Sequence, residues 1–510
     1  TTFTYDTVGR LTKTSDSAPG AGTIDFGYDI LDRLIQETTP QGTMAYQYDV
    51  LGRRTQMTAN GQQPVTYGYD AASRLTRVAQ GSLFAALGYD NANRRTSLGY
   101  SNGTSTSYAY DLASRLTSIT HNGPAGLIEA LTYTYDTAGN RVSLQRANGT
   151  ASLLPNAVAS ATYDAANEQT QFAGATLQYD ANGSLTSDGV NTYQWDARNR
   201  LIAISGGTTA SFSYDPLGRR ASKTINASTG LSTGGVSTQF LYDGNDIAAE
   251  IGGGAVSTAY LRSLNIDEMF GFLRQDGAYF SIYDGLGSTQ ALTNQTGSSA
   301  AQYTYEPFGK TQSSDPTFVN SIQFTGREND NTGLFYYRAR YYSSIRSRFA
   351  SEDPLDISEI ILLGQGDQSE VPDSQYISLL RSTVLASPQF NNRYSYALNN
   401  PVNFSDPTGE IVPQLVGCVL GAGISISVDV LSGKKINLLD AGLGCSFGAF
   451  GGFAYGKSFK FGLHDPHHYF PLFGRNLPHI QVNWWQKGVS GSGNAFRVPI
   501  PPPIYRFFKP

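Results

Sequence analysis

Three observations predict a mainly β fold for this 510-residue chain, dominated by a long antiparallel sheet of hairpins. The dipeptide Tyr-Asp recurs every 20 to 23 residues between Tyr5 and Tyr110, and a fixed period of this size indicates a repeat architecture. An aromatic residue often stands two positions before the tyrosine, and turn-forming residues follow the aspartate. The composition agrees, because 55 Gly, 32 Tyr and 15% charged residues suit a β-rich chain with many turns.

The repeat around Tyr69 shows how one copy is expected to fold. Tyr67 and Tyr69 stand at positions i and i+2 of a strand, so their rings share one face. We expect such rings to stack across neighbouring strands, at roughly 0.2–1 kcal/mol per cross-strand pair. Asp70 starts a turn through its side chain, Ser73 takes the awkward backbone angle, and Arg74 opens the return strand. Further copies stand at Tyr5, Tyr28, Tyr48, Tyr110, Tyr135, Trp195 and Tyr214.

The period loosens after Asp215, and a segment of different character follows. It contains GLFYYRARYY at 333–342, RFASEDP at 348–354, NRYSYALNNP at 392–401 and VNFSDPTG at 402–409. This pattern closely resembles the Rhs-associated core that ends the Rhs and YD-repeat proteins, a group that includes polymorphic toxins, Tc-toxin C subunits and teneurins.

The resemblance covers about four fifths of the chain and implies a domain order. Residues 1–300 would form a spirally wound β-shell, and 301–409 the core, with an insert at 356–391. About 300 residues of repeat would wind only a partial shell, which a partner chain or a preceding region of the protein would complete. A Gly-rich apolar segment at 410–455 and a small α+β effector domain at 456–510 would follow.

In the toxin members of this group, the core releases a C-terminal effector by aspartyl autoproteolysis. The matching positions here are Arg340, Asp353 and Asp406. Two carboxylates that share a proton are forced to different pKa values, so one acts as base on water and the other as acid. A nearby guanidinium can hold one carboxylate ionised and stabilise developing negative charge.

Several departures from the family pattern bear on this expectation. Asp356 stands where the family usually has Gly, the insert separates the two Asp-Pro elements, and Glu410 replaces a common Leu. Asp-Pro pairs also make good turns on their own. Cleavage within a few residues of Gly409 and a purely structural role for both aspartates are therefore the two alternatives.

The composition changes abruptly after Gly409. Residues 411–428 carry no charged side chain, and this stretch barely reaches the length that spans a bilayer. Gly417 and Gly421 stand four apart, as in close helix packing within membranes. The segment is interpreted as a Gly-rich helical hairpin, with membrane contact during delivery as the alternative.

The last sixty residues hold the densest candidate chemistry. Four of the five histidines fall in one window, namely His464, His467, His468 and His479. Clustered imidazoles suit general acid–base work or a divalent metal, although no zinc-finger or His-Glu-x-x-His spacing is present. Residues 410–510 carry nine Lys and Arg against four Asp and Glu, whereas the rest carries 27 against 37. A basic tail on an acidic carrier favours nucleic acid as the effector substrate.

These features predict a Rhs-type polymorphic toxin, or a fragment of one, with an effector of nuclease type. No cofactor is expected for the shell and core. Expected partners are an immunity protein and either secretion machinery or a shell-completing chain. The protein would be bacterial, and secreted or delivered at the cell surface. The alternative is a non-enzymatic surface or adhesion protein with a structural tail.

Overall fold

A computed structural model describes residues 1–148, 158, 160–226, 235–354 and 392–410, together with five strands between residues 458 and 499. The chain divides into two compact units. The first comprises Thr1–Glu352, Tyr394–Tyr396 and Asn400–Pro407, and the second comprises the remaining residues. The domain limits drawn from the sequence stay predictions.

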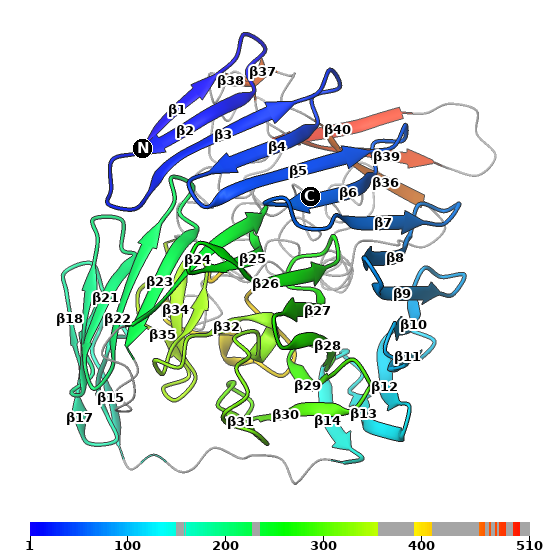
Figure 1. The fold of residues 1–510 in the computed structure, drawn as a ribbon. Coiled ribbons are helices and arrows are strands. Elements are labelled where there is room, and N and C mark those ends of the chain that lie inside the picture. The colour runs from blue at the N-terminus through cyan, green and yellow to red at the C-terminus, as the bar shows by residue number, and fades with distance from the viewer. Residues whose placement is uncertain are drawn as a thin grey trace, which may run out of the picture. The chain divides into compact units, whose positions relative to one another are not determined.

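The first unit begins with a 14-stranded antiparallel sheet in which every strand pairs with the next one in the chain (Figure 1). Its strands are β1 (Thr2–Tyr5), β2 (Leu11–Asp16), β3 (Gly22–Tyr28), β4 (Leu34–Thr39), β5 (Gly42–Tyr48), β6 (Arg54–Ala59), β7 (Val65–Tyr69), β8 (Leu75–Gln80), β9 (Leu83–Tyr89), β10 (Arg95–Tyr100), β11 (Ser105–Tyr110), β12 (Leu116–Gly123), β13 (Gly126–Tyr135) and β14 (Arg141–Arg146).

A second 14-stranded sheet follows the same rule, after a three-stranded sheet of β15 (Ala161–Tyr163), β16 (Gln169–Phe172) and β17 (Ala175–Thr176). Its strands are β18 (Gln178–Tyr179), β19 (Leu185–Ser187), β20 (Asn191–Trp195), β21 (Leu201–Gly206), β22 (Thr209–Tyr214), β23 (Arg220–Asn226), β24 (Val236–Asp243), β25 (Asp246–Gly252), β26 (Ala255–Arg262), β27 (Met269–Arg274), β28 (Gly277–Tyr283), β29 (Thr289–Thr293), β30 (Ser299–Tyr305) and β31 (Thr311–Ser313). The predicted antiparallel hairpin architecture is confirmed.

The hairpin turn is built by the aspartate of each repeat, as the turn at Asp49 shows. One carboxylate oxygen of Asp49 accepts the backbone N–H groups of Leu51 and Arg53, both at 2.9 Å, while the other accepts Arg53 Nε at 2.7 Å. Gly52 closes the turn at φ +78°, a conformation that glycine adopts without steric cost. The turn therefore satisfies its own backbone donors, as expected for an Asx-type turn.

The arginine of each repeat also binds the next repeat. Arg33 donates to the Asp49 carbonyl at 3.0 Å, and its guanidinium lies 5.0 Å from the centre of the Tyr48 ring. Tyr48 in turn donates its hydroxyl to the Leu34 carbonyl at 2.8 Å. The same guanidinium-on-ring contact joins Arg10 to Tyr28, Arg53 to Tyr69, Arg74 to Tyr89, Arg94 to Tyr110, Arg115 to Tyr135, Arg200 to Tyr214 and Arg219 to Tyr242.

This contact corrects the expectation of ring-on-ring stacking between repeats. In the described part of the first sheet, no ring pair joins tyrosines of successive repeats. The register shifts by one residue at each Tyr-Asp, for example between Gln47 and Tyr48. The arginine of the preceding repeat covers the tyrosine ring, and a cation over an aromatic face is attractive.

In the middle repeats of the first sheet, the aromatic residue two positions before the tyrosine faces the core, whereas Phe3 of the first repeat is exposed. Tyr46 and Tyr67 are buried, as are Met57 and Val78 of the same sheet. These side chains belong to one apolar cluster that also contains Leu241, Leu261, Phe270, Phe280 and Ile282 of the second sheet. Each sheet thus buries one face against the other, which is the pattern that alternating strands predict.

A small four-stranded sheet ends the described part of the first unit. It contains β32 (Glu328–Asn329), β33 (Phe335–Tyr337), β34 (Arg340–Ser343) and β35 (Arg348–Phe349), with a short 3₁₀ turn η1 (Phe324–Gly326) just before it. The second unit contains η3 (Ala397–Asn399) and strands β36 (Ser458–His464), β37 (Tyr469–Phe470), β38 (Arg475–Asn476), β39 (His479–Trp485) and β40 (Gly493–Pro499).

Three sequence expectations fall on residues that the structure does not describe. The predicted helices of the C-terminal domain and the insert at 356–391 lie outside the described residues, as does the apolar segment 411–428. Among the helices that the structure describes, none has the length and apolar character needed to cross a bilayer.

Candidate functional site

The hairpin of β33 and β34 carries Arg340, one of the three core residues for which a catalytic role was predicted. Arg340 is the first residue of β34 and pairs in register with Tyr337 of β33. Tyr341 packs against Tyr336 and Tyr342 against Phe349, so successive side chains enter different aromatic clusters. Because side chains alternate along a strand, Arg340 shares the face of Tyr342. The run of tyrosines thus buries both faces of a short hairpin.

Arg340 and Asp406 form a buried ion pair. Arg340 Nη2 lies 3.4 Å from Asp406 Oδ2, and the two side chains are 2% and 1% exposed. The Arg340 guanidinium carbon also lies 3.6 Å from the centre of the Phe349 ring. The structure therefore brings together two residues that are 66 positions apart in the chain.

A cluster of neutral hydroxyl groups includes Tyr396, whose pKa is affected by the charge of Asp406. The Thr325 and Tyr337 hydroxyls lie 2.9 Å apart, and the Tyr396 hydroxyl lies 3.3 Å from that of Tyr337. Burial raises the pKa of Tyr396, and the nearby charge of Asp406 raises it further, so its phenol stays protonated. Charge–charge interactions are strong in such a dry, aromatic environment.

Asp353, the third residue predicted from the family pattern, belongs to the second unit. Its backbone N–H donates to the carbonyl of Arg393 at 3.0 Å, and the residue is 9% exposed. Asp353 is therefore a largely buried residue with a fixed backbone position, and its catalytic role stays a prediction.

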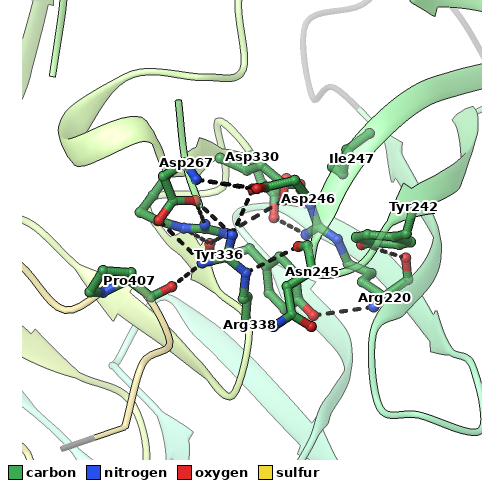
Figure 2. Close-up of polar contacts among 12 residues, drawn as sticks. Arg220, Tyr242, Asn245, Asp246, Ile247, Asp267, Asp330, Tyr336, Arg338 and Pro407 are labelled. Atoms are coloured by element: carbon green, nitrogen blue, oxygen red, sulfur yellow. Dashed lines mark hydrogen bonds and ion pairs between the residues drawn. The ribbon is translucent and has the colours of Figure 1, made fainter. Parts of the chain in front are cut away.

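Arg338, two residues before Arg340, holds a second buried charge cluster that the sequence reading missed (Figure 2). Its Nη2 donates to Asp246 Oδ1 at 2.8 Å and to Asp267 Oδ1 at 2.7 Å. Its Nε donates to the Asn245 carbonyl at 3.1 Å, and its Nη1 donates to the carbonyl oxygen of Pro407. All three nitrogens of the Arg338 guanidinium thus donate hydrogen bonds.

The pKa values of the two carboxyl groups around Arg338 shift in opposite directions. Burial raises the pKa of Asp246, and the charges of Arg262 and Arg338 offset this only partly. Burial acts in the same direction on Asp267, but Arg327 and Arg338 outweigh it and lower the pKa of that carboxyl. Asp267 is thus the firmly ionised partner of the cluster.

A further buried network ties the second sheet to the small sheet. Arg220 of β23 is 0% exposed and pairs with Glu328 and Asp330, while Lys223 reaches Asp330 at 3.0 Å. The Arg220 guanidinium also lies 4.2 Å from the centre of the Tyr336 ring. Figure 2 shows Arg220 and Asp330 near the Arg338 cluster. This network supports the hairpin that carries Arg338 and Arg340.

The signal that could have revealed Arg338 is the Arg-Ala-Arg spacing in 338–340. Asp246 and Asp267 lie in degenerate repeats, far from Arg338 in the chain, so no local pattern joins them to it. Ion-pair partners that are this far apart in the chain can be identified only from the three-dimensional arrangement of the strands.

The histidines of the tail are described only by the backbone. His464 of β36 and His479 of β39 are register partners. Their side chains, together with His467 and His468, lie outside the described residues, so the effector site stays a prediction. Among the side chains that the structure describes, no group of three His, Cys, Asp or Glu could hold a metal ion.

Similar proteins share the repeats. The chain is 29% identical to the tRNA nuclease WapA of Bacillus subtilis over 303 residues, which covers 57% of this chain and 11% of WapA. It is 30% identical to the toxin protein Tse5 of Pseudomonas aeruginosa over 134 residues, which covers 26% of this chain and 8% of Tse5. The chain thus spans about a tenth of these relatives.

The fold also matches a solved structure, and a family model matches the sequence. The crystal structure of TcdB2-TccC3-TEV superposes with a TM-score of 0.55 at 17% identity, over 79% of this chain and 24% of that one. The family model of the teneurin YD-shell matches residues 36–121 and 99–361, which is more than half of the chain. The chain therefore belongs to the YD-shell family of Rhs and YD-repeat proteins.

Proposed function

We propose that the chain is the shell-and-core part of a Rhs-type polymorphic toxin whose core cuts its own chain near Gly409. The observation that carries the proposal is the buried Arg340–Asp406 pair, only three residues before Gly409. A buried ion pair adds little stability compared with apolar side chains of similar size. Its place beside the predicted cleavage segment supports a catalytic role.

The proposed reaction is hydrolysis of one peptide bond by two carboxyl groups. Because a guanidinium favours the ionised form of a neighbouring carboxylate, we assign Asp406 as the base. Asp406 takes a proton from water, whose oxygen attacks the peptide carbonyl carbon. Asp353, as the acid, protonates the leaving nitrogen while the C–N bond breaks. Arg340 then balances the negative charge at the site.

The released piece is proposed to be a nuclease-like effector. The support is the basic character of residues 410–510 and the four histidines of the window that begins at His464. A divalent metal could assist these histidines. The proposal also includes an immunity protein, a secretion system or shell-completing chain, and delivery from a bacterial cell.

The cleavage proposal is tested by purifying the full chain and analysing it by gel electrophoresis and intact mass. We expect two pieces, the smaller of about 100 residues, which begins within a few residues of Gly409. Asp406→Asn and Asp353→Asn should leave the chain whole. Asp70→Asn, which alters a repeat turn remote in sequence from the core, is the matched control and should be cut like the wild type.

The same experiment separates the toxin from the non-enzymatic surface protein. An uncut wild-type chain, or equal cutting of Asp406→Asn, would reject the autoprotease. The effector is tested separately by inducing the full chain in a bacterial host. Growth arrest with nucleic-acid breakdown that His467→Ala and His468→Ala abolish would support the nuclease, and arrest that persists in both variants would reject these residues.

A further inference from the structure

Arg338 holds the chain immediately after the proposed catalytic aspartate. Its guanidinium Nη1 donates to the Pro407 carbonyl oxygen, while Arg340 pairs with the preceding Asp406. Two arginines that are two residues apart thus bind two consecutive residues of the segment that leads to Gly409. Figure 2 shows the Pro407 carbonyl directed at Arg338.

The grip on Pro407 is rigid because the guanidinium has further fixed partners, and Nη1 itself also donates to Asp267 Oδ2 at 3.2 Å. Asp246 and Asp267 both bind Arg338 Nη2, and the Asn245 carbonyl binds Nε. Asp267 is itself held by Arg327, and Asp246 lies 3.6 Å from Arg262. A guanidinium with this many fixed partners can present one N–H in one direction only.

The backbone of Arg338 adds a second argument. Arg338 is the first residue of the two-residue turn between Tyr337 and Arg340, where φ is +59°. Glycine is the usual residue at such a position. A large charged side chain in a left-handed conformation is retained where the surrounding structure requires it, and such outliers concentrate at functional sites.

We propose that Arg338 is a positioning residue for the self-cleavage. It fixes the Pro407 carbonyl so that a single peptide bond after Asp406 is presented to the carboxyl groups. This inference rests on the proposed autoprotease and adds a residue outside the Arg340, Asp353 and Asp406 set. It requires no new reactant, because Arg338 changes neither its charge nor its covalent structure during the reaction.

The competing explanation is that Arg338 only stabilises the fold through its two aspartates. The two roles predict different outcomes for which peptide bond is cleaved. A loosened Pro407 lets the following chain slide, so more than one bond is presented. A purely structural residue changes how much folded protein forms, without changing which bond is cut.

The test uses the full chain with Arg338→Met, Arg338→Lys and the matched control Arg262→Met. Arg262 contacts Asp246 and the Ile247 carbonyl, so its loss disturbs the same acidic cluster. Each variant is checked for folding by circular dichroism and thermal unfolding. The rate of cleavage is followed by gel, and the new N-terminus is read by mass spectrometry.

We expect Arg338→Met to be cut about tenfold or more slowly than the wild type, as loss of a charge-assisted hydrogen bond implies. It should yield several new N-termini, and Arg338→Lys, whose ammonium lacks the fixed donors of a guanidinium, should also be cut more slowly than the wild type. Arg262→Met should be cut at a single site. If a folded Arg338→Met protein is cut at the wild-type rate and at the same bond, the positioning role is rejected while the autoprotease proposal stands. The same holds if Arg262→Met changes the rate and the cleaved bond as much as Arg338→Met does.

Two further outcomes concern both proposals. If Arg338→Met fails to fold, Arg338→Lys decides: slower cutting or several new N-termini in the folded lysine variant would support the assigned grip, and an unchanged rate with one N-terminus would contradict it. If the wild type is uncut, or if Asp406→Asn is cut normally, the autoprotease itself fails, and the positioning role fails with it.

Discussion

The repeat sheets and the core use the same residue pair in opposite ways. In the repeats of the first sheet, aspartate and arginine lie four positions apart, and their side chains are partly exposed, as for Asp70 and Arg74 at 25% and 29%. In the core, Arg220 and Asp330 are 110 positions apart and fully buried. The repeat pair closes a local turn, whereas the core pair joins elements that are distant in the chain.

The difference teaches where charge matters. A partly exposed pair remains hydrated, so a repeat such as that of Asp70 and Arg74 can lose its pair without leaving a buried charge. A buried pair is costly to break, because the remaining partner has lost its water. The core therefore depends on each of its charged residues, and the repeats depend on the sum of many similar turns.

The largest expected effect is the loss of Arg220. Arg220→Met should destabilise the protein by about 3–5 kcal/mol, because Glu328 and Asp330 are left as buried, poorly compensated charges. Arg74→Ala is the matched repeat variant and should have a much smaller effect. Urea unfolding of both variants tests this, and similar losses would erase the contrast between the two regions.

A second effect comes from His121, which joins the two large sheets. Its Nδ1 lies 2.8 Å from the Thr106 hydroxyl and its Nε2 lies 3.1 Å from the Tyr283 carbonyl. Burial lowers the pKa of His121 from 6.5 to about 4, although the Tyr283 carbonyl and the charge of Glu129 oppose this. The unfolded chain therefore binds this proton more readily than the folded chain.

The stability from neutral His121 is fully present above about pH 6.5 and is lost as the pH falls toward 4. The total loss is on the order of 3 kcal/mol, at 1.36 kcal/mol per pKa unit. His121→Gln can keep both hydrogen bonds but cannot titrate, so its unfolding free energy should fall less between pH 7 and pH 4.5. If the unfolding free energies of the two proteins change equally with pH, His121 is not a buried neutral histidine between the two large sheets.

The smallest effect contrasts two glycines in equivalent turns. Gly52 and Gly309 both close a turn, at φ +78° and +87°. An added Cβ at Gly52 meets nothing within 4 Å, whereas at Gly309 it would lie 2.4 Å from the Phe324 ring. Gly52→Ala should cost about 1 kcal/mol in backbone strain, and Gly309→Ala a further 1–3 kcal/mol from overpacking. Thermal unfolding compares them, and equal costs would mean that Phe324 moves freely.

The sequence by itself determined the repeat architecture, because each hairpin is encoded within about twenty residues. The aspartate that forms the turn, the glycine or serine that follows it and the aromatic that faces the core all lie inside one copy. Local hydrogen bonds therefore suffice to predict the antiparallel order of both large sheets. The family pattern similarly pointed to Arg340, Asp353 and Asp406 as one set, without saying which aspartate pairs with the arginine.

Other features were decided by the tertiary structure alone. The arginine that covers each tyrosine ring comes from the preceding repeat, so its contact depends on how successive hairpins pack. The partners of Arg338 come from two strand ends more than seventy residues earlier, together with a loop that follows it. Burial and charge pairing at such distances depend on the placement of whole strands, and no local spacing in the chain records that placement.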